Sequence, residues 1–244
     1  MRFRKIALAL FACMAVAAVA AGSAQAQWTI GTAGNALGAS AHEKVEINKH
    51  PGTTLRLDST VLGAPITLTA ENVHCAAGVE CTIDGENFGT NHSTGTLEFT
   101  NVTVDPSTCS VPNNKVVTEA LEDEVIMDPS NAAGPVFDKF KPAGAGTTFA
   151  TIELTGAECP FAGVVAPVKG TATGEAVKTN GSGGFEPVAT GVLQTPQTLL
   201  FGETQQTTGG GALTLGKAAA VLSGAVDNTL AGTAHKGEAF GADE

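Results

Sequence analysis

Short runs in which apolar and polar residues alternate cover most of the chain and constrain its fold more than any other feature. The apolar positions of two such runs are Ile66, Leu68 and Ala70 in PITLTAENV, and Ala150, Ile152 and Leu154 in TTFATIELTG. A period of two is the pattern of a β-strand with one buried face and one solvent-exposed face. These runs therefore predict strands that each contribute one side to a core.

Turn-forming residues separate the runs. Most of the 11 prolines and many of the 30 glycines lie between them, and turn signals at short, fairly even spacing predict an all-β antiparallel sandwich or a barrel-like fold. In GTLEFTNVTV the apolar phase changes at Asn101, which predicts a β-bulge. The segment TEALEDEVIM (118–127) fits a strand or a helix, and the pattern leaves that choice open.

The N-terminus has the three parts of a secretory signal peptide. A basic stretch at 2–5 precedes an apolar stretch at 6–21, and the sequence AQA at 24–26 supplies a small-residue cleavage pattern. We expect a signal peptide over residues 1–26, cleavage between Ala26 and Gln27, and a secreted, extracellular protein. No later run has the length of about 20 apolar residues that a transmembrane helix needs.

The rest of the chain is expected to form one domain. Residues 27–42 are small and weakly patterned, which predicts a loose N-terminal arm, and residues 43–244 are predicted to form a single β-sandwich domain. The last nine residues, KGEAFGADE, are expected to fray.

The chain is acidic, with a formal net charge of −11. Removal of residues 1–26 would take away three basic residues and no acidic one, so the charge would become −14. A protein of this charge is repelled by nucleic acid, and a nucleic-acid partner is therefore not expected. We interpret the acidity as a source of solubility outside the cell.

Four cysteines lie beyond the predicted signal peptide: Cys75, Cys81, Cys109 and Cys159. An even number in an exported protein predicts two disulfides, although four cysteines allow three pairings. We favour Cys75–Cys81 and Cys109–Cys159. The first would staple a hairpin of two strands around the turn AAGV, and the second would close a long loop.

Zinc is the competing interpretation of HCAAGVEC (74–81). Structural zinc sites use cysteine pairs spaced C-x₂₋₄-C, whereas Cys75 and Cys81 are spaced C-x₅-C. His74 would also point to the opposite face of a strand from Cys75. The sequence therefore predicts no metal site and no cofactor. The acidic turn at 84–87 lacks the ligand spacing of an EF-hand, and weak calcium binding stays open there.

No motif for catalysis is present. The chain has no G-x-S-x-G elbow, and its histidines are scattered, without H-E-x-x-H spacing. The remaining enzymatic option is a hydrolase site assembled from distant loops, with Glu122, Asp123 and His92 brought together. The acidic run LEDEVIMD is more simply explained as a solvated strand edge that prevents aggregation.

A resemblance is carried by Cys109-Ser110-Val111, KVVTEALED, FDKFKPAGAGTTFATIELTGAECP and the Gly/Thr-rich C-terminal part. This middle half of the chain resembles a group of exported, β-rich bacterial proteins of unknown function. The resemblance implies a secreted all-β protein and implies no activity.

Two functions from different classes follow from these expectations. The first is a secreted, non-enzymatic β-sandwich that acts as an envelope-associated structural or interaction module, with a cell-envelope component or another protein as its partner. The alternative is a secreted hydrolase or small-ligand-binding protein with a site built from distant loops. An apolar cavity between the sheets would favour a small-ligand carrier.

Overall fold

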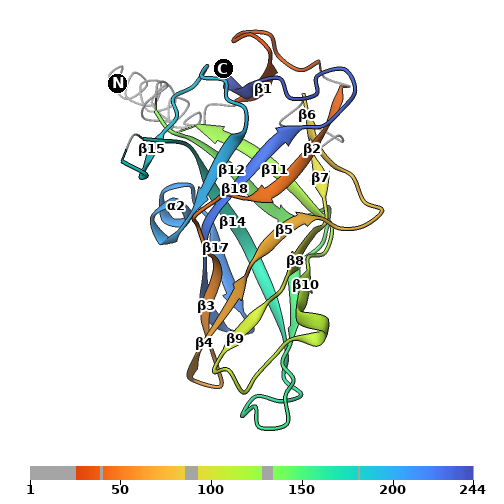
Figure 1. Cartoon of the computed structure of the whole chain (residues 1–244), viewed down its shortest axis with the longest axis vertical. Coiled ribbons are helices and arrows are strands. Elements are labelled where there is room, and N and C mark those ends of the chain that lie inside the picture. Colours follow the sequence, from red (N-terminus) through yellow and green to blue (C-terminus); the bar gives the residue numbers. More distant parts are fainter. Residues whose placement is uncertain (1–25, 39–40, 86–92, 128–133, 181, 244) are drawn as a thin grey trace, which may run out of the picture.

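The structure, a computed structural model, describes residues 26–38, 41–85, 93–127, 134–180 and 182–243. The described chain is almost entirely antiparallel β-structure with two disulfides, which confirms the predicted all-β fold (Figure 1). The predicted signal peptide falls on residues outside the described ranges, apart from Ala26. No helix among the described residues is long and apolar enough to cross a membrane.

One half of the elongated molecule, drawn at the top of Figure 1, is a barrel. Its strands, in the order in which they pair within the described chain, are β7 (Thr94–Gly95), β11 (Leu121–Met127), β12 (Val136–Pro142), β14 (Val165–Thr179), β16 (Gln197–Phe201), β18 (Ala218–Leu230), β2 (His42–Lys49) and β6 (Cys81–Asp84). The two ends of this row meet, because the Asp84 amide donates to Ser93 Oγ at 2.9 Å and the Thr94 amide to Thr82 Oγ1 at 3.4 Å.

The other half, which we call the two-sheet half, lies at the bottom of Figure 1. One sheet contains β13 (Thr148–Glu153), β14, β17 (Ala212–Leu215), β18, β3 (Leu55–Val61), β4 (Ala64–Ala70) and β9 (Thr103–Asp105). The other contains β10 (Lys115–Val117), β8 (Leu97–Thr100) and β5 (Asn72–Cys75), and the 3₁₀ turn Pro112–Asn114 precedes β10. Buried hydrophobic residues of both halves form a continuous cluster.

The long strands β14 and β18 run through both halves and bend at glycines. β18 pairs with β3 up to Ser223 and with β16 from Gly224 onward. Gly224 has φ +117°, and a Cβ there would lie 2.5 Å from the Thr54 carbonyl oxygen. Gly170 in β14 has φ +102°, and its Cβ would lie 2.0 Å from the Ala212 oxygen. Only glycine fits this conformation and this close approach.

The period-two pattern places the core as the sequence predicts. The six apolar residues of the two runs quoted above are all buried: Ile66, Leu68, Ala70, Ala150, Ile152 and Leu154. Asn101 has φ +52° and lies between β8 and β9, where the apolar phase changes. Residues 121–127, which fitted a strand or a helix, form strand β11.

The structure corrects the expectation of a loose N-terminal arm. Within residues 27–42, β1 (Gln27–Ile30) pairs with β19 (Phe240–Asp243), so neither the start of the arm nor the C-terminal end is loose. Trp28 is 3% exposed and packs against Phe240, with ring centroids 5.4 Å apart. No local pattern indicates this pair, because the two strands are short and more than 200 positions apart.

The disulfides have the predicted pairing, Cys75–Cys81 and Cys109–Cys159. The predicted hairpin around AAGV is wrong, because β5 pairs with β8 and β6 pairs with β2. Cys75–Cys81 therefore links the three-stranded sheet to the barrel. Cys109–Cys159 joins the loop after β9 to the loop between β13 and β14.

Two further elements complete the described fold. The strand β15 (Phe185–Pro187) pairs with the end of β14. The short helix α2 (Glu203–Thr208) packs on the outside of the barrel against β14 and β16, and it buries Gln206.

Candidate functional site

The inside of the barrel contains a cavity of about 40 Å³ with polar side chains in its wall. We call it the acidic pocket. Asp123 on β11, Asp138 on β12 and Asn228 on β18 line it together with Ser93, which lies before β7. On β12 the side chains of Val136, Asp138 and Phe140 share one face by strand alternation. The acid therefore takes an apolar position of the strand.

Asp123 and Asp138 form a carboxyl pair. Val125 is the residue directly opposite Asp138, so Asp123 is its diagonal neighbour on the same face of the sheet. Their carboxyl groups are hydrogen-bonded to each other, and Asp123 is also bonded to the Ser93 side chain. Because two carboxylates repel, this hydrogen bond requires a proton on one of them.

The pKa values of the pair are raised. Desolvation by the surrounding protein, the largest cause, raises the pKa of Asp123 from 3.8 to about 6, even though the residue keeps some solvent exposure, and the negative charge of Asp84 adds to this rise. Burial and then the charge of Asp123 raise the pKa of Asp138 well above its usual value. The pair therefore keeps a proton to a higher pH than an isolated carboxyl group would.

Two oxygen atoms of this pocket have no hydrogen-bond partner. Asp138 is 2% exposed and Asn228 is 6% exposed, and the Oδ1 atom of each is buried and unpaired. Buried polar atoms are paired in most proteins, so such atoms call for an explanation. Asp84 on β6 has one unpaired oxygen as well, while its other oxygen contacts His42 Nδ1.

Two apolar cavities continue from the acidic pocket along the inside of the molecule. A middle cavity of about 30 Å³ shares four lining residues with the acidic pocket: Ile47, Leu97, Phe140 and Asn228. It shares four others with a lower cavity of about 60 Å³: Leu55, Phe99, Phe149 and Leu222. The three cavities thus form a row with an acidic end and an apolar end.

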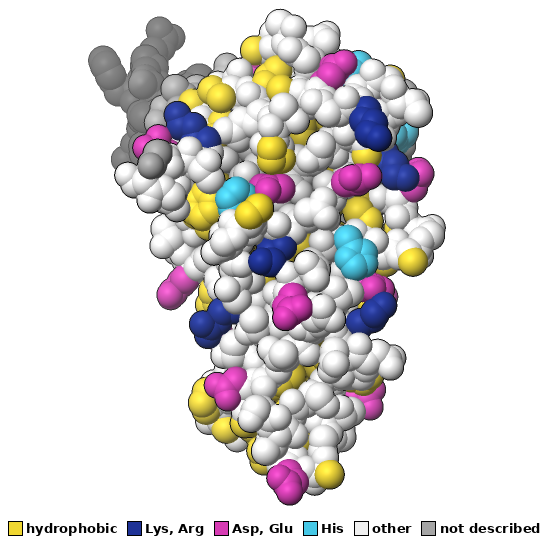
Figure 2. All heavy atoms as spheres, viewed as in Figure 1, with side chains coloured by type: hydrophobic (Ala, Val, Ile, Leu, Met, Phe, Trp, Pro, Cys, Tyr) yellow, Lys and Arg dark blue, Asp and Glu magenta, His cyan; other side chains and the backbone are white. Residues whose placement is uncertain are grey.

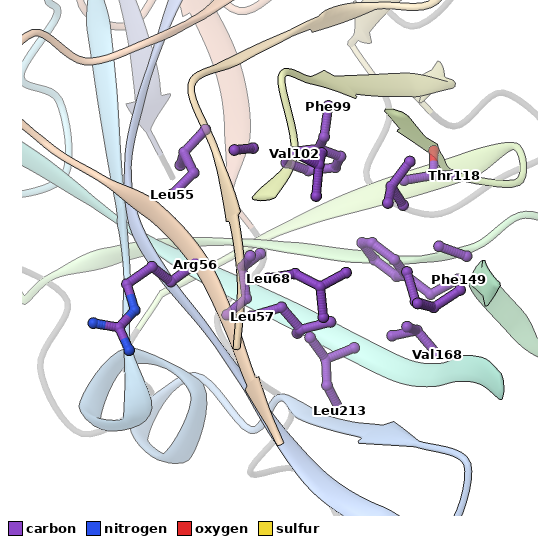
Figure 3. A pocket seen from close by; sticks show the side chains of 15 residues that line it. Leu55, Arg56, Leu57, Leu68, Phe99, Val102, Thr118, Phe149, Val168 and Leu213 are labelled. Atoms are coloured by element: carbon purple, nitrogen blue, oxygen red, sulfur yellow. The ribbon is translucent and has the colours of Figure 1, made fainter. Parts of the chain in front are cut away.

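The lower cavity lies between the two sheets of the two-sheet half. Figure 3 shows side chains of both sheets converging on it, among them Leu68 from β4, Phe99 from β8 and Leu213 from β17. The guanidinium of Arg56 points away and bonds to Asp58 at 2.8 Å. The Thr118 hydroxyl accepts the Leu97 amide at 2.9 Å. The polar ends of Arg56 and Thr118 are thus engaged elsewhere, and the wall of the lower cavity is apolar.

The structure turns two residues of the sequence-based hydrolase site, Glu122 and Asp123, in different directions. Asp123 points into the barrel, whereas Glu122, its neighbour on the strand, forms an ion pair with Lys141 at 3.1 Å and accepts the Gly144 amide. His92, Asp128 and residues 86–87 of the acidic turn lie outside the described residues. The interpretation of the acidic run as a solvated edge is wrong for Asp123, which faces the interior.

Metal chemistry at HCAAGVEC has no support from the geometry. Cys75 and Cys81 are joined in a disulfide, and His74 Nε2 lies 3.4 Å from Glu98. The ammonium of Lys115 also contacts Glu98, and its hydrogen bond is the main cause that lowers the pKa of that carboxyl. Within the described ranges, no group of three or more His, Cys, Asp or Glu residues is placed to hold a metal ion.

A second polar cluster lies on the barrel beside Phe185. His50 Nδ1 is 2.8 Å from Asp227 Oδ1, and the Thr198 hydroxyl donates to the same oxygen at 2.7 Å. The His50 ring also contacts the Phe185 ring edge-on. Since the hydroxyl donates to the acid, it is not activated by the histidine as a nucleophile would be.

Sequence reasoning missed Asp138 and Asn228. For Asp138 a signal existed, because the acid stands in phase with Val136 and Phe140 in PVFDKF. For Asn228 the signal was weaker, since AVDNTLAG reads as a strand with polar residues on both faces.

Comparisons with protein-family models, curated proteins and solved structures found no match to this chain. The resemblance to exported bacterial proteins therefore stays a prediction.

Proposed function

We propose that the protein is an exported, non-enzymatic β-barrel protein that binds a small, largely apolar molecule in its interior. The observation that carries this proposal is the row of three adjoining cavities. An apolar cavity with a few polar groups at one end has the chemistry of a ligand site. Together the three cavities approach the volume of about 150 Å³ at which a protein cavity binds benzene.

Export is supported by two independent features. The N-terminal sequence has the order of a secretory signal peptide, and disulfides persist in oxidising compartments outside the cytosol. The surface agrees with a role in solution or at the cell envelope, since Figure 2 shows charged side chains of both signs dispersed over the visible face.

The placement of the acid pair favours binding over hydrolysis. A hydrolase for polymers holds its carboxyl groups in a cleft that admits the chain. Asp123 and Asp138 face the inside of the barrel and a cavity of only about 40 Å³. A pair in such a place can contact a small group, whereas a polysaccharide or a polypeptide cannot reach it.

The test uses apolar probes and one blocking substitution. Leu222 borders both the middle and the lower cavity, so Leu222→Phe fills the space between them. We expect n-hexanol to bind the wild-type protein in calorimetry and to raise its Tm, and we expect Leu222→Phe to weaken binding at least tenfold. Val117→Phe, at an exposed position on β10, is the matched control and keeps the affinity. Absence of probe binding to the wild-type protein would contradict the proposal.

A second candidate is the interaction module expected from the sequence. Leu62, in the turn between β3 and β4, is 83% exposed, and Val165 at the start of β14 is 61% exposed. Both lie in the two-sheet half, away from the barrel, where they offer apolar contacts to a partner surface. If this half anchors the protein in the envelope, Leu62→Ser with Val165→Ser releases it from the envelope fraction; unchanged retention would contradict an anchoring role.

A further inference from the structure

The acidic pocket offers acceptors and negative charge and lacks a cation. No lysine, arginine or histidine is among the described residues that line it. Two more acids lie at the pocket: Glu122, which borders it beside Asp123 on β11 and bonds to Lys141, and Asp84 on β6, which contacts His42. The pocket therefore holds an uncompensated negative charge among unpaired oxygen atoms.

A buried charge without a partner is costly, and the cost falls when a cation neutralises it. One proton shared between Asp123 and Asp138 compensates only one of the two carboxyl groups. The unpaired Oδ1 atoms of Asp138 and Asn228 stay available as acceptors. A group that carries one positive charge and several N–H donors satisfies all of these requirements.

We infer that the ligand is a small amphiphilic amine, whose ammonium group binds among Asp123, Asp138 and Asn228 and whose apolar tail extends into the middle and lower cavities. This inference rests on the proposed function. A primary ammonium has three N–H donors, which matches three acceptor residues. Hydrogen bonds between charged groups are about twice as strong as neutral ones, so the head group would contribute affinity and orientation together.

The row of cavities limits the size of this amine. Benzene, with six carbon atoms, fills a cavity of about 150 Å³, and the three cavities together do not exceed that volume. The tail is therefore unbranched or slightly branched and of about six carbon atoms. Phe140, which borders both the acidic pocket and the middle cavity, lies where head and tail would join.

The test compares n-hexylamine with n-hexanol, which has the same tail and an uncharged head. Both are titrated calorimetrically at pH 7.5 into protein produced from the full chain with its disulfides formed. We expect the amine to bind at least tenfold more tightly than the alcohol. The double variant Asp123→Asn/Asp138→Asn removes the charge and is expected to reduce amine affinity at least tenfold while alcohol affinity changes less than threefold. Glu153→Gln, at an exposed acid, is the control and changes neither affinity.

The outcomes separate the two proposals. Equal affinity for amine and alcohol, or an amine preference that persists in the double variant, would overturn the amine inference and leave interior binding in place. Failure of both probes to bind the wild-type protein would overturn the proposed function as well. Retained alcohol binding shows that the double variant is folded. If the double variant loses all binding, the single variant Asp138→Asn is used instead. It keeps the charge of Asp123 and is expected to retain the amine preference.

Discussion

Asp138 occupies a position where an apolar residue would serve the core better. It lies on the inward face of β12, 2% exposed, with one oxygen bonded to no protein group. Burial raises the pKa of Asp138, so protonation lowers the cost of burying it, because a protonated carboxyl is far less costly to bury than a carboxylate. The same raised pKa makes the stability of the protein depend on pH.

The first prediction concerns this dependence. The folded state raises the pKa of both aspartates, so between pH 4 and the folded values it binds more protons than the unfolded state. The free energy of unfolding then falls as the pH rises from 4 to the folded-state pKa values. Above those values the loss is complete. We expect Asp138→Asn to reduce the loss between pH 4.5 and 7.5 by on the order of 1–3 kcal/mol in urea unfolding.

Glu153→Gln is the control for this measurement, since Glu153 is exposed on β13. Its stability curve is expected to run parallel to that of the wild-type protein. A curve for Asp138→Asn that also runs parallel to the wild type would contradict a shared proton in the pair.

At the scale of the elements, β14 and β18 decide the architecture because each belongs to both halves. Their bends at Gly170 and Gly224 redirect the strands from the two-sheet half into the barrel. Both bends combine a positive φ with a backbone oxygen in the place of a Cβ. The positive φ alone, or the close oxygen alone, would disfavour any residue other than glycine.

The second prediction separates these two effects. Gly224→Ala and Gly170→Ala are expected to cost more than about 2 kcal/mol each in thermal or urea unfolding, since the new Cβ must displace the Thr54 or the Ala212 carbonyl. Gly63→Ala is the matched comparison. It has φ +83° with nothing within 4 Å of its Cβ, so it is expected to cost only about 1 kcal/mol. Equal costs at all three sites would contradict a role for close backbone approach at the bends.

Elements with a local signal could be predicted from the sequence, and their partners could not. Alternation in PITLTAENV and TTFATIELTG identified strands and their buried faces, and an even cysteine count identified two disulfides. Local patterns do not encode pairing, so Cys75 and Cys81 were expected to close a hairpin although their strands belong to different sheets. The strand at Trp28 was missed because its partner strand β19 lies at the other end of the chain.

The candidate site could not be predicted from the sequence for the same reason. Asp123 comes from β11, Asp138 from β12 and Asn228 from β18, and only the closure of the barrel brings them to one cavity. The sequence showed Asp123 as one acid of an exposed run. Its inward direction follows from the phase of Leu121 and Val125 once the segment is known to be a strand.

At the scale of the whole molecule, the two disulfides have unequal structural roles. Cys75–Cys81 closes a loop of sequence separation 6, whereas Cys109–Cys159 spans a separation of 50 across β10 to β13. A longer closed loop removes more conformational entropy from the unfolded chain. The second bond is thus expected to contribute more to the stability of the two-sheet half.

The third prediction follows from this difference. Replacement of Cys109 and Cys159 by alanine is expected to cost about 4 kcal/mol of unfolding free energy, and the same replacement of Cys75 and Cys81 about 2 kcal/mol. Chemical denaturation of the two variants beside the wild-type protein measures both values. A larger loss for the Cys75–Cys81 variant would show that its link between barrel and sheet outweighs loop entropy.

The row of interior cavities is proposed to be a binding site with an acidic end. A crystal structure of the protein grown with n-hexylamine tests it most directly. We expect density inside the molecule, with the nitrogen at hydrogen-bond distance, about 2.7–3.2 Å, from oxygen atoms of Asp123, Asp138 and Asn228 and with the tail beyond Phe140. Empty cavities at saturating amine, or amine bound only on the outer surface, would contradict it.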